Sequence, residues 1–199
     1  MTKLAKTQYP IFDLLQRRWS PRAFSETPID PKIITRLFEA ARWAASSRND
    51  QPWRFIVASS EDIQVHQQMF DCLRPGNQKW AGNAPLLAIV LAPRHYSFTD
   101  EPNPIAYYDT GQAVANLVVE AMAHGLYCHQ MGGIDRDKIQ ALYAVPEPYQ
   151  PVVAIAIGYL GEAADLPEDL QDRELSERVR KPLSEIVFKG AWGAPAELA

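Results

Sequence analysis

The sequence predicts a single domain, residues 1–199, in which helices cover both faces of a central β-sheet. Three segments rich in β-branched and aromatic residues have the length of strands: residues 53–58 (WRFIVA), 86–91 (LLAIVL) and 151–159 (PVVAIAIGY). None of them alternates regularly between apolar and polar residues, and strands of this kind are covered on both faces. With 199 residues, 47% of them hydrophobic, the chain can bury one such core.

Two helices are predicted near the N-terminus. Apolar residues repeat at helical spacing over residues 11–15, just before a basic pair, which indicates a short helix that ends there. Asp30 is a favourable N-cap and Pro31 a favourable first residue, so a second helix is expected to begin there and to run to about Trp43. Trp53, which opens the first strand, is expected to be an anchor in the core.

A longer helix is predicted over residues 106–124, ending at Gly125. Apolar residues dominate residues 114–122, and several flanking positions are apolar too. Such a helix is buried, either as the central core helix or as half of a dimer interface. Tyr107 and Tyr108 at its start either belong to the core or line a substrate site.

The C-terminal part is predicted to be less regular. Asp135 is expected to cap one more short helix. Residues 162–177 are acidic and contain Pro, which predicts a surface loop. Residues 178–199 form a predicted C-terminal extension, in which a basic patch precedes Phe188 and Trp192; these aromatic residues need a surface to cover, and a partner subunit could supply it.

Composition and charge exclude several classes of function. The chain carries 20 Lys and Arg against 24 Asp and Glu, a net charge of −4, so we expect no nucleic-acid partner and no membrane partner. Two cysteines and the absence of a targeting pattern favour a cytoplasmic protein. His124, Cys128 and His129 have no second ligand cluster at a suitable spacing, so no metal site is expected.

One short basic motif, Arg18-x-Ser20-x-Arg22, suggests a local anion site. Pro21 favours extended geometry at Ser20, and in an extended chain alternate residues point to the same side. Two guanidinium groups and a hydroxyl would then converge, which suits a phosphate dianion. The motif could also be a solvated basic turn after a helix.

The chain resembles the FMN-dependent nitroreductase family. Four blocks match in the family's order: RRWSPRAF at 17–24, AASSRNDQPWRFIV at 44–57, GLYCHQMGGID at 125–135 and PVVAIAIGYLG at 151–161, and the basic RVRKPLSEIV at 178–187 also fits. The resemblance implies an α+β fold with a central mixed, mostly antiparallel sheet flanked by helices on both faces. It also implies a homodimer, with FMN at the subunit interface and the C-terminal tail extending onto the partner subunit.

The resemblance also implies which residues bind the cofactor. Two basic pairs far apart in the sequence would hold the phosphate, and the stretch at 45–49 of one subunit would cover the flavin ring bound by the other; Ala45 stands where the family commonly has proline. Asn77 would read the pyrimidine edge, and two glycines, which could also form an ordinary turn, would let backbone approach the ring. The full set is Arg18, Trp19, Ser20, Arg22, Ala45, Ser46, Ser47, Asn49, Asn77, Met131, Gly132, Gly133, Arg178 and Arg180.

The expected function is that of an FMN-dependent oxidoreductase. NADH or NADPH would reduce the flavin and leave, and a nitroaromatic, quinone or other electron-poor small molecule would then bind over the same ring, in ping-pong fashion. Because the cofactor carries the chemistry, no catalytic side chain is expected. The alternatives are a flavin-binding carrier or sensor without turnover, and a small module that uses the arginine patches to bind anions or nucleic acid.

Overall fold

The computed structural model describes residues 3–99 and 101–196. Its centre is a four-stranded sheet with strand order β1-β2-β4-β3. The strands are β1 (Arg54–Ser59), β2 (Leu86–Pro93), β3 (Tyr127–Met131) and β4 (Tyr149–Gly158), and all three pairings are antiparallel. Together with the helices this confirms the predicted α+β class.

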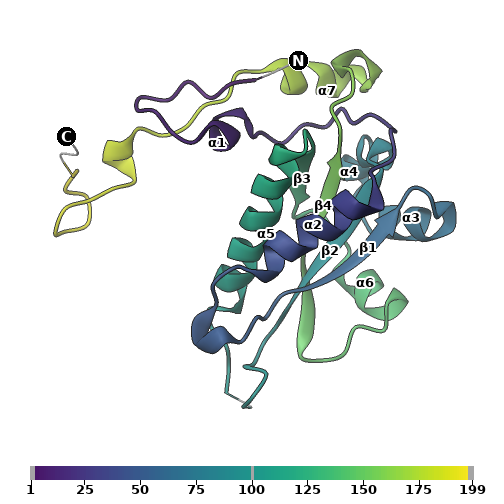
Figure 1. Cartoon of the computed structure of the whole chain (residues 1–199), viewed down its shortest axis with the longest axis horizontal. Coiled ribbons are helices and arrows are strands. Elements are labelled where there is room, and N and C mark those ends of the chain that lie inside the picture. Colours follow the sequence, from purple (N-terminus) through teal and green to yellow (C-terminus); the bar gives the residue numbers. More distant parts are fainter. Residues whose placement is uncertain (1–2, 100, 197–199) are drawn as a thin grey trace.

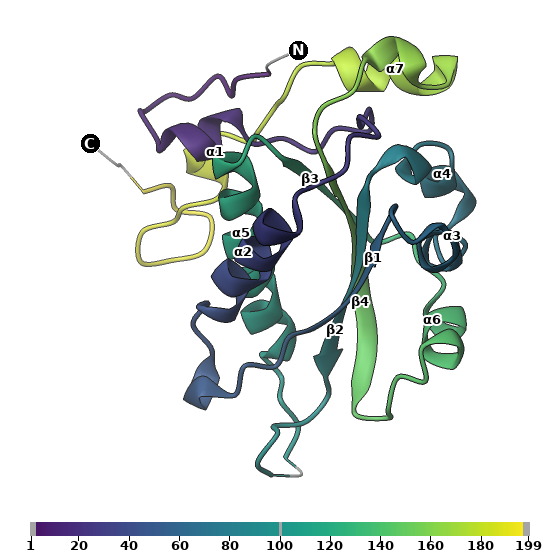
Figure 2. The same ribbon diagram turned by 45° about the vertical axis from the view of Figure 1, so that its right-hand side comes forward.

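Helices cover both faces of the sheet. Figure 2 shows α2 (Pro31–Arg42) and α5 (Ala106–Ala123) on one face, and α3 (Ile63–Phe70), α4 (Pro75–Gln78) and α6 (Arg136–Leu142) on the other. In β2, Leu86, Ala88 and Val90 pack towards α2 and α5, whereas the alternate residues Leu87 and Ile89 pack into the opposite layer. All eight residues of β2 are buried, as the lack of alternation predicted.

Local signals set the helix boundaries as predicted. The Asp30 side chain accepts a 2.8 Å hydrogen bond from Lys32 N at the start of α2, and Asp135 accepts one from Lys138 N at the start of α6. The long helix α5 ends before Gly125, whose φ of +73° is the left-handed conformation that glycine adopts at low cost.

Several elements differ from the prediction. Strand β1 lies at the edge of the sheet, so it is only partly covered, and Val57 is 42% exposed. Strand β3 and helices α3 and α4 were not predicted. The prediction of a surface loop over residues 162–177 is wrong where α7 (Glu168–Leu175) forms. This helix forms because Leu170 and Glu174 are buried against the rest of the domain.

The N-terminal segment and the segment that follows α7 run side by side above the sheet (Figure 1). Helix α1 (Asp13–Arg17) confirms the predicted N-terminal helix. The Arg178 guanidinium donates to the backbone oxygens of Lys3 and Gln16 at 2.8 and 2.7 Å, which ties the start of the C-terminal segment to the N-terminal one. Beyond Arg180 the segment leaves the body of the domain; residues 197–199 of the predicted extension lie outside the described residues.

None of the helices in the described part of the chain combines the length and the apolar character needed to cross a membrane.

Candidate functional site

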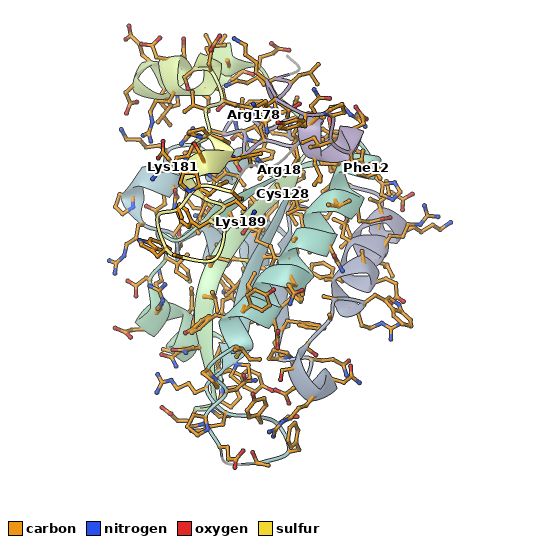
Figure 3. The ribbon with its side chains drawn as sticks, turned by 90° about the vertical axis from the view of Figure 1, so that its left-hand side faces the viewer. Phe12, Arg18, Cys128, Arg178, Lys181 and Lys189 are labelled. Carbon is orange, nitrogen blue, oxygen red and sulfur yellow. The ribbon has the colours of Figure 1, made fainter. Side chains whose placement is uncertain are left out.

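The two predicted basic segments meet in one cavity. A cavity of about 210 Å³ is lined by Arg18, Ser20 and Arg22 from one segment and by Arg178 and Arg180 from the other. Figure 3 shows Arg18 and Arg178 close together, beside α1 and above β3. The remaining lining residues are Lys3, Trp19, Arg173, Ser176 and Glu177. The tertiary structure therefore brings together side chains that lie more than 150 positions apart in the sequence.

The cavity is strongly cationic. Six Lys and Arg side chains line it against a single carboxylate, Glu177. Burial, followed by the charge of Arg180, lowers the pKa of Arg18 below its ordinary range. The pKa of Arg178 is also lowered, again mainly by burial and then by Arg18 and Arg180. These guanidinium groups are held close enough to repel one another, so an anion between them would relieve the repulsion.

Backbone contacts fix the segment that carries Arg18 and Arg22. At its start, Arg18 N donates to Leu14 O at the end of α1, with an N···O distance of 3.0 Å. In its middle, Nδ1 of His129 lies 2.7 Å from the backbone oxygen of Pro21. At its end, Gly161 N donates to Ala23 O at 3.0 Å. The segment is thus clamped between β3 and the end of β4.

Glycine at position 161 makes the last of these contacts possible. A Cβ atom there would lie 2.7 Å from the backbone carbon and oxygen of Phe24, which is too close for any other residue without a shift of the backbone. Phe24 itself forms an isolated antiparallel bridge with Leu160. The block GYLG at residues 158–161, where the predicted third strand ends, therefore serves to dock the arginine-bearing segment.

Glu174 is a site residue that the sequence did not reveal. Its carboxylate is 4% exposed and accepts hydrogen bonds from Arg22 N, at 3.0 Å to either oxygen, and from Ala23 N at 3.2 Å. The guanidinium of Arg22 lies 4.0 Å away. Because Glu174 sits in an acidic stretch that is typical of solvated loops, no local pattern distinguishes it from its neighbours.

A second group of predicted residues gathers at the far end of β3. Asn77 Nδ2 donates to Gly133 O at 3.0 Å, which places the amide beside the glycine pair. Met131, the last residue of β3, is buried, and a Cβ at Gly132 would meet no atom of the described residues within 4 Å. The structure therefore shows open space beside Gly132, with an amide close by.

Strand β3 connects the two groups. Cys128, near its start, is fully buried close to Arg18, as Figure 3 shows, and this burial raises the pKa of its thiol to about 12. Met131 ends the strand three residues later, or about 10 Å away at the usual rise of a β-strand. A ligand that lies along β3 with an anionic end at the arginines would place a flat part near Gly132.

Trp19 lines the cationic cavity, but its indole Nε1 is shielded from solvent and has no hydrogen-bond partner among the described residues. A buried donor without a partner is costly. A ligand in the cavity would reach this nitrogen only if the indole moved, so Trp19 contributes ring surface to the site as it stands.

The remaining predicted residues lie elsewhere. Ala45 and Ser46 precede the short 3-10 helix Ser47–Asn49, and Ser47 N donates to a carboxylate oxygen of Asp109 at 3.0 Å, in the first turn of α5. The arginine segment lies at the other end of that helix (Figures 1 and 2). With 18 residues α5 is about 27 Å long, so one chain does not bring the two parts together.

The structure also tests two expectations about aromatic residues. Tyr107 and Tyr108 are 49% and 70% exposed, so the interpretation as core residues is wrong. Trp53 is buried, as predicted for a core anchor. Two exposed aromatic side chains near the loop at 46–49 form a surface that another molecule could cover.

Comparison with known proteins identifies relatives of this chain in sequence and in fold. The family model described as "Nitroreductase family" matches residues 15–159. A crystal structure of an oxidoreductase containing FMN is 35% identical, with a TM-score of 0.88, and the match covers 95% of this chain and 96% of that one. A nitroreductase-family protein from Clostridium difficile shares the fold at a TM-score of 0.71 and 20% identity, over 92% of this chain and 99% of its own.

Two curated sequences are also similar. A putative NADH dehydrogenase/NAD(P)H nitroreductase of Ralstonia nicotianae is 26% identical over 136 residues, which cover 59% of this chain and 69% of that protein. An uncharacterized 15.4 kDa protein of Mycolicibacterium smegmatis is 37% identical over 90 residues, or 45% of this chain. The chain spans only 60% of the length of the latter.

Proposed function

The chain belongs to the nitroreductase family, and we propose from this that it is an FMN-dependent oxidoreductase that uses NAD(P)H to reduce an electron-poor acceptor such as a nitroaromatic or a quinone. When bound, FMN supplies the redox chemistry, with donor and acceptor visiting the same site in turn, in ping-pong fashion. The residues of the chain bind the cofactor, orient it and exclude water.

The observation that carries the proposal is the cavity shared by the two arginine pairs. Arg18, Arg22, Arg178 and Arg180 surround a space of about 210 Å³, and Ser20 adds a hydroxyl. A phosphate monoester presents two negative charges and several acceptor oxygens, which match guanidinium donors that stay protonated. We assign these side chains to the phosphate of FMN.

The flat part of the cofactor is assigned to the end of β3. Gly132 leaves room for an aromatic ring to approach the backbone, and the Asn77 amide is close enough to meet a polar edge of that ring. Backbone N–H groups in this region would stabilise negative charge that arrives on reduction. No side-chain acid or base is required for this role.

The assembly is proposed to be a homodimer. The stretch at residues 45–49 lies about one α5 length from the arginines, so only a second copy can bring it to a site built on them. The C-terminal segment supports the same arrangement, because it leaves the domain and exposes Ile186 and Trp192 by 57% and 92%. We propose that this segment covers the partner subunit.

A spectrum and a turnover assay test the proposed function. The purified protein should be yellow, or become so on addition of FMN, and it should oxidise NADH or NADPH when a quinone or nitroaromatic acceptor is present. A colourless protein that neither takes up FMN nor oxidises NAD(P)H would contradict the proposal. A flavin that stays oxidised for minutes under anaerobic NAD(P)H would instead identify a carrier or sensor.

A further inference from the structure

A second cavity lies at the opposite end of the molecule from the arginine cluster. It has a volume of about 500 Å³ and is formed where β1 and β4 begin and where β2 leads into the connection to α5. Its walls include Asp50, Arg54, His95, Tyr96, Phe98 and Tyr149. Its size falls within the range of small-molecule sites, and the proposed FMN site uses none of these residues.

Arg54 gives this cavity a fixed positive charge. Its Nη1 donates to the backbone oxygens of Gln51 and Trp53 at 2.9 and 2.7 Å, and its guanidinium carbon lies 5.4 Å from the centre of the Tyr149 ring. Among the described residues no carboxylate lies within 4 Å of it to form an ion pair. Arg54 is therefore already oriented and has not been neutralised.

Aromatic side chains form another part of the cavity wall. The rings of Tyr96 and Phe98 lie 5.4 Å apart and are tilted by 34°. The guanidinium carbon of Arg48 lies 5.2 Å from the Tyr96 ring and 5.8 Å from the Phe98 ring. Phe98 is 52% exposed, so much of its ring surface remains available to a ligand.

A buried carboxylate holds this aromatic wall in place. Asp50 Oδ1 accepts hydrogen bonds from Ser97 N at 2.9 Å and from Ser97 Oγ at 2.5 Å, and Oδ2 accepts one from Asn103 Nδ2 at 3.0 Å. These bonds satisfy both oxygens of Asp50 but leave its negative charge in place, so Arg54 is the group of this cavity that would attract an anion. The same residue directly follows Asn49, so the cavity adjoins the stretch proposed to cover the partner's flavin.

We propose that this cavity binds the phosphorylated adenosine end of NAD(P)H. A purine stacked on the exposed ring of Phe98, with the Arg54 guanidinium in the same cavity to meet its phosphate, fits these side chains. The sequence has no glycine-rich dinucleotide motif after a strand, so the donor needs another means of holding its adenosine half. This inference rests on the proposed function, because it takes NAD(P)H as the donor.

Calorimetry with adenosine 2′,5′-bisphosphate tests the assignment without any turnover. The protein is first saturated with FMN, so that the arginine cluster is occupied. Arg54→Gln removes the cation, and Phe98→Ser removes a ring that is 52% exposed. Arg94→Gln is the matched control, because Arg94 lies in the same connection but does not line the cavity.

The expected result is that Arg54→Gln weakens binding of the bisphosphate by at least about tenfold, the usual effect of losing a charge-assisted hydrogen bond. Phe98→Ser is expected to weaken it by about three- to tenfold, and Arg94→Gln by less than about twofold. KM for NAD(P)H should rise in parallel in the first two variants, while kcat at saturating donor and the FMN absorbance stay at the wild-type level.

The inference is overturned if the wild type does not bind the bisphosphate, or if Arg54→Gln and Arg94→Gln weaken binding equally. The inference is also overturned if Arg54→Gln weakens the binding of benzoate but not the binding of the bisphosphate. That result would identify an aromatic acid as the ligand instead. Failure of the proposed function can be told apart from failure of this inference. A protein that binds no FMN can still be titrated with the bisphosphate, and the part of the binding that is lost in Arg54→Gln then reports on this cavity.

Discussion

Replacing Glu174 tests whether a buried carboxylate organises the arginine cluster. In Glu174→Ala, the N–H groups of Arg22 and Ala23 lose their acceptor, and both lie in a region that water reaches poorly. A hydrogen bond to a charged group contributes about 1.5–3 kcal/mol. The two N–H groups both lose such a bond, so the free energy of unfolding should fall by about 3–5 kcal/mol. Glu174→Gln keeps one acceptor oxygen and should lose about half as much.

The same substitution should weaken cofactor binding, because the backbone that carries Arg22 is no longer fixed. We expect the dissociation constant of FMN to rise at least about tenfold in Glu174→Ala, since a misplaced arginine forfeits a charge-assisted bond. It should rise less in Glu174→Gln, where the geometry is partly kept and a negative charge near the phosphate has been removed.

Urea unfolding of the FMN-free protein and fluorescence titration with FMN measure the two effects separately. Glu177→Ala is the control, because Glu177 lines the arginine cavity but is 74% exposed, and its one ion pair among the described residues, with Lys6, contributes little. If Glu174→Ala and Glu177→Ala unfold within about 0.5 kcal/mol of each other, a typical effect of surface substitutions, Glu174 does not hold the segment.

The remaining predictions concern the phosphate, the strand below it, the ring and the dimer. Arg22→Ala and Arg180→Ala should each raise the FMN dissociation constant about tenfold or more while circular dichroism stays unchanged, and full flavin occupancy in both would show that the phosphate lies elsewhere. Burial lowers the pKa of His129 from 6.5 to about 4, so the neutral ring stabilises the fold fully above pH 6.5. This contribution, at most about 3 kcal/mol, is lost as the pH falls from 6.5 towards 4. The free energy of unfolding in urea should therefore depend less on pH in His129→Gln than in the wild type. Gly132→Ala should have the same free energy of unfolding as the wild type, because the added Cβ meets open space. It should nevertheless retain less FMN, and an unchanged FMN absorbance would place the flavin ring elsewhere. Removal of residues 186–199 should shift the protein from dimer to monomer in light scattering, whereas an unchanged mass would show that the tail covers no partner.

Local patterns were enough to predict most of the elements. The caps at Asp30 and Asp135, the fully apolar strand β2 and the long helix before Gly125 all depend on residues a few positions apart, and the structure has each of them. The arginine motif could be predicted for the same reason. Alternate residues of an extended segment point to the same side, whatever the rest of the chain does.

Other features depend on contacts that no local pattern encodes. Strand β3 has the mixed sequence YCHQM and forms because β4 offers it a hydrogen-bonding edge, and α7 forms within an acidic stretch because Leu170 and Glu174 find buried positions. Glu174 gains its role only when the N-terminal segment crosses above it. The same long-range folding placed the cavity beside Arg54 at the far end of the domain.

The amino-acid order thus determined helices α1, α2, α5 and α6, strands β1, β2 and β4, and the presence of two arginine pairs, because those properties follow from the preferences of neighbouring residues. Only the tertiary structure decided that the two pairs face one cavity, that a buried carboxylate holds one of them, and that the stretch at residues 45–49 lies a helix length away. Those facts depend on which distant segments pack together, and packing is settled by burial over the whole chain.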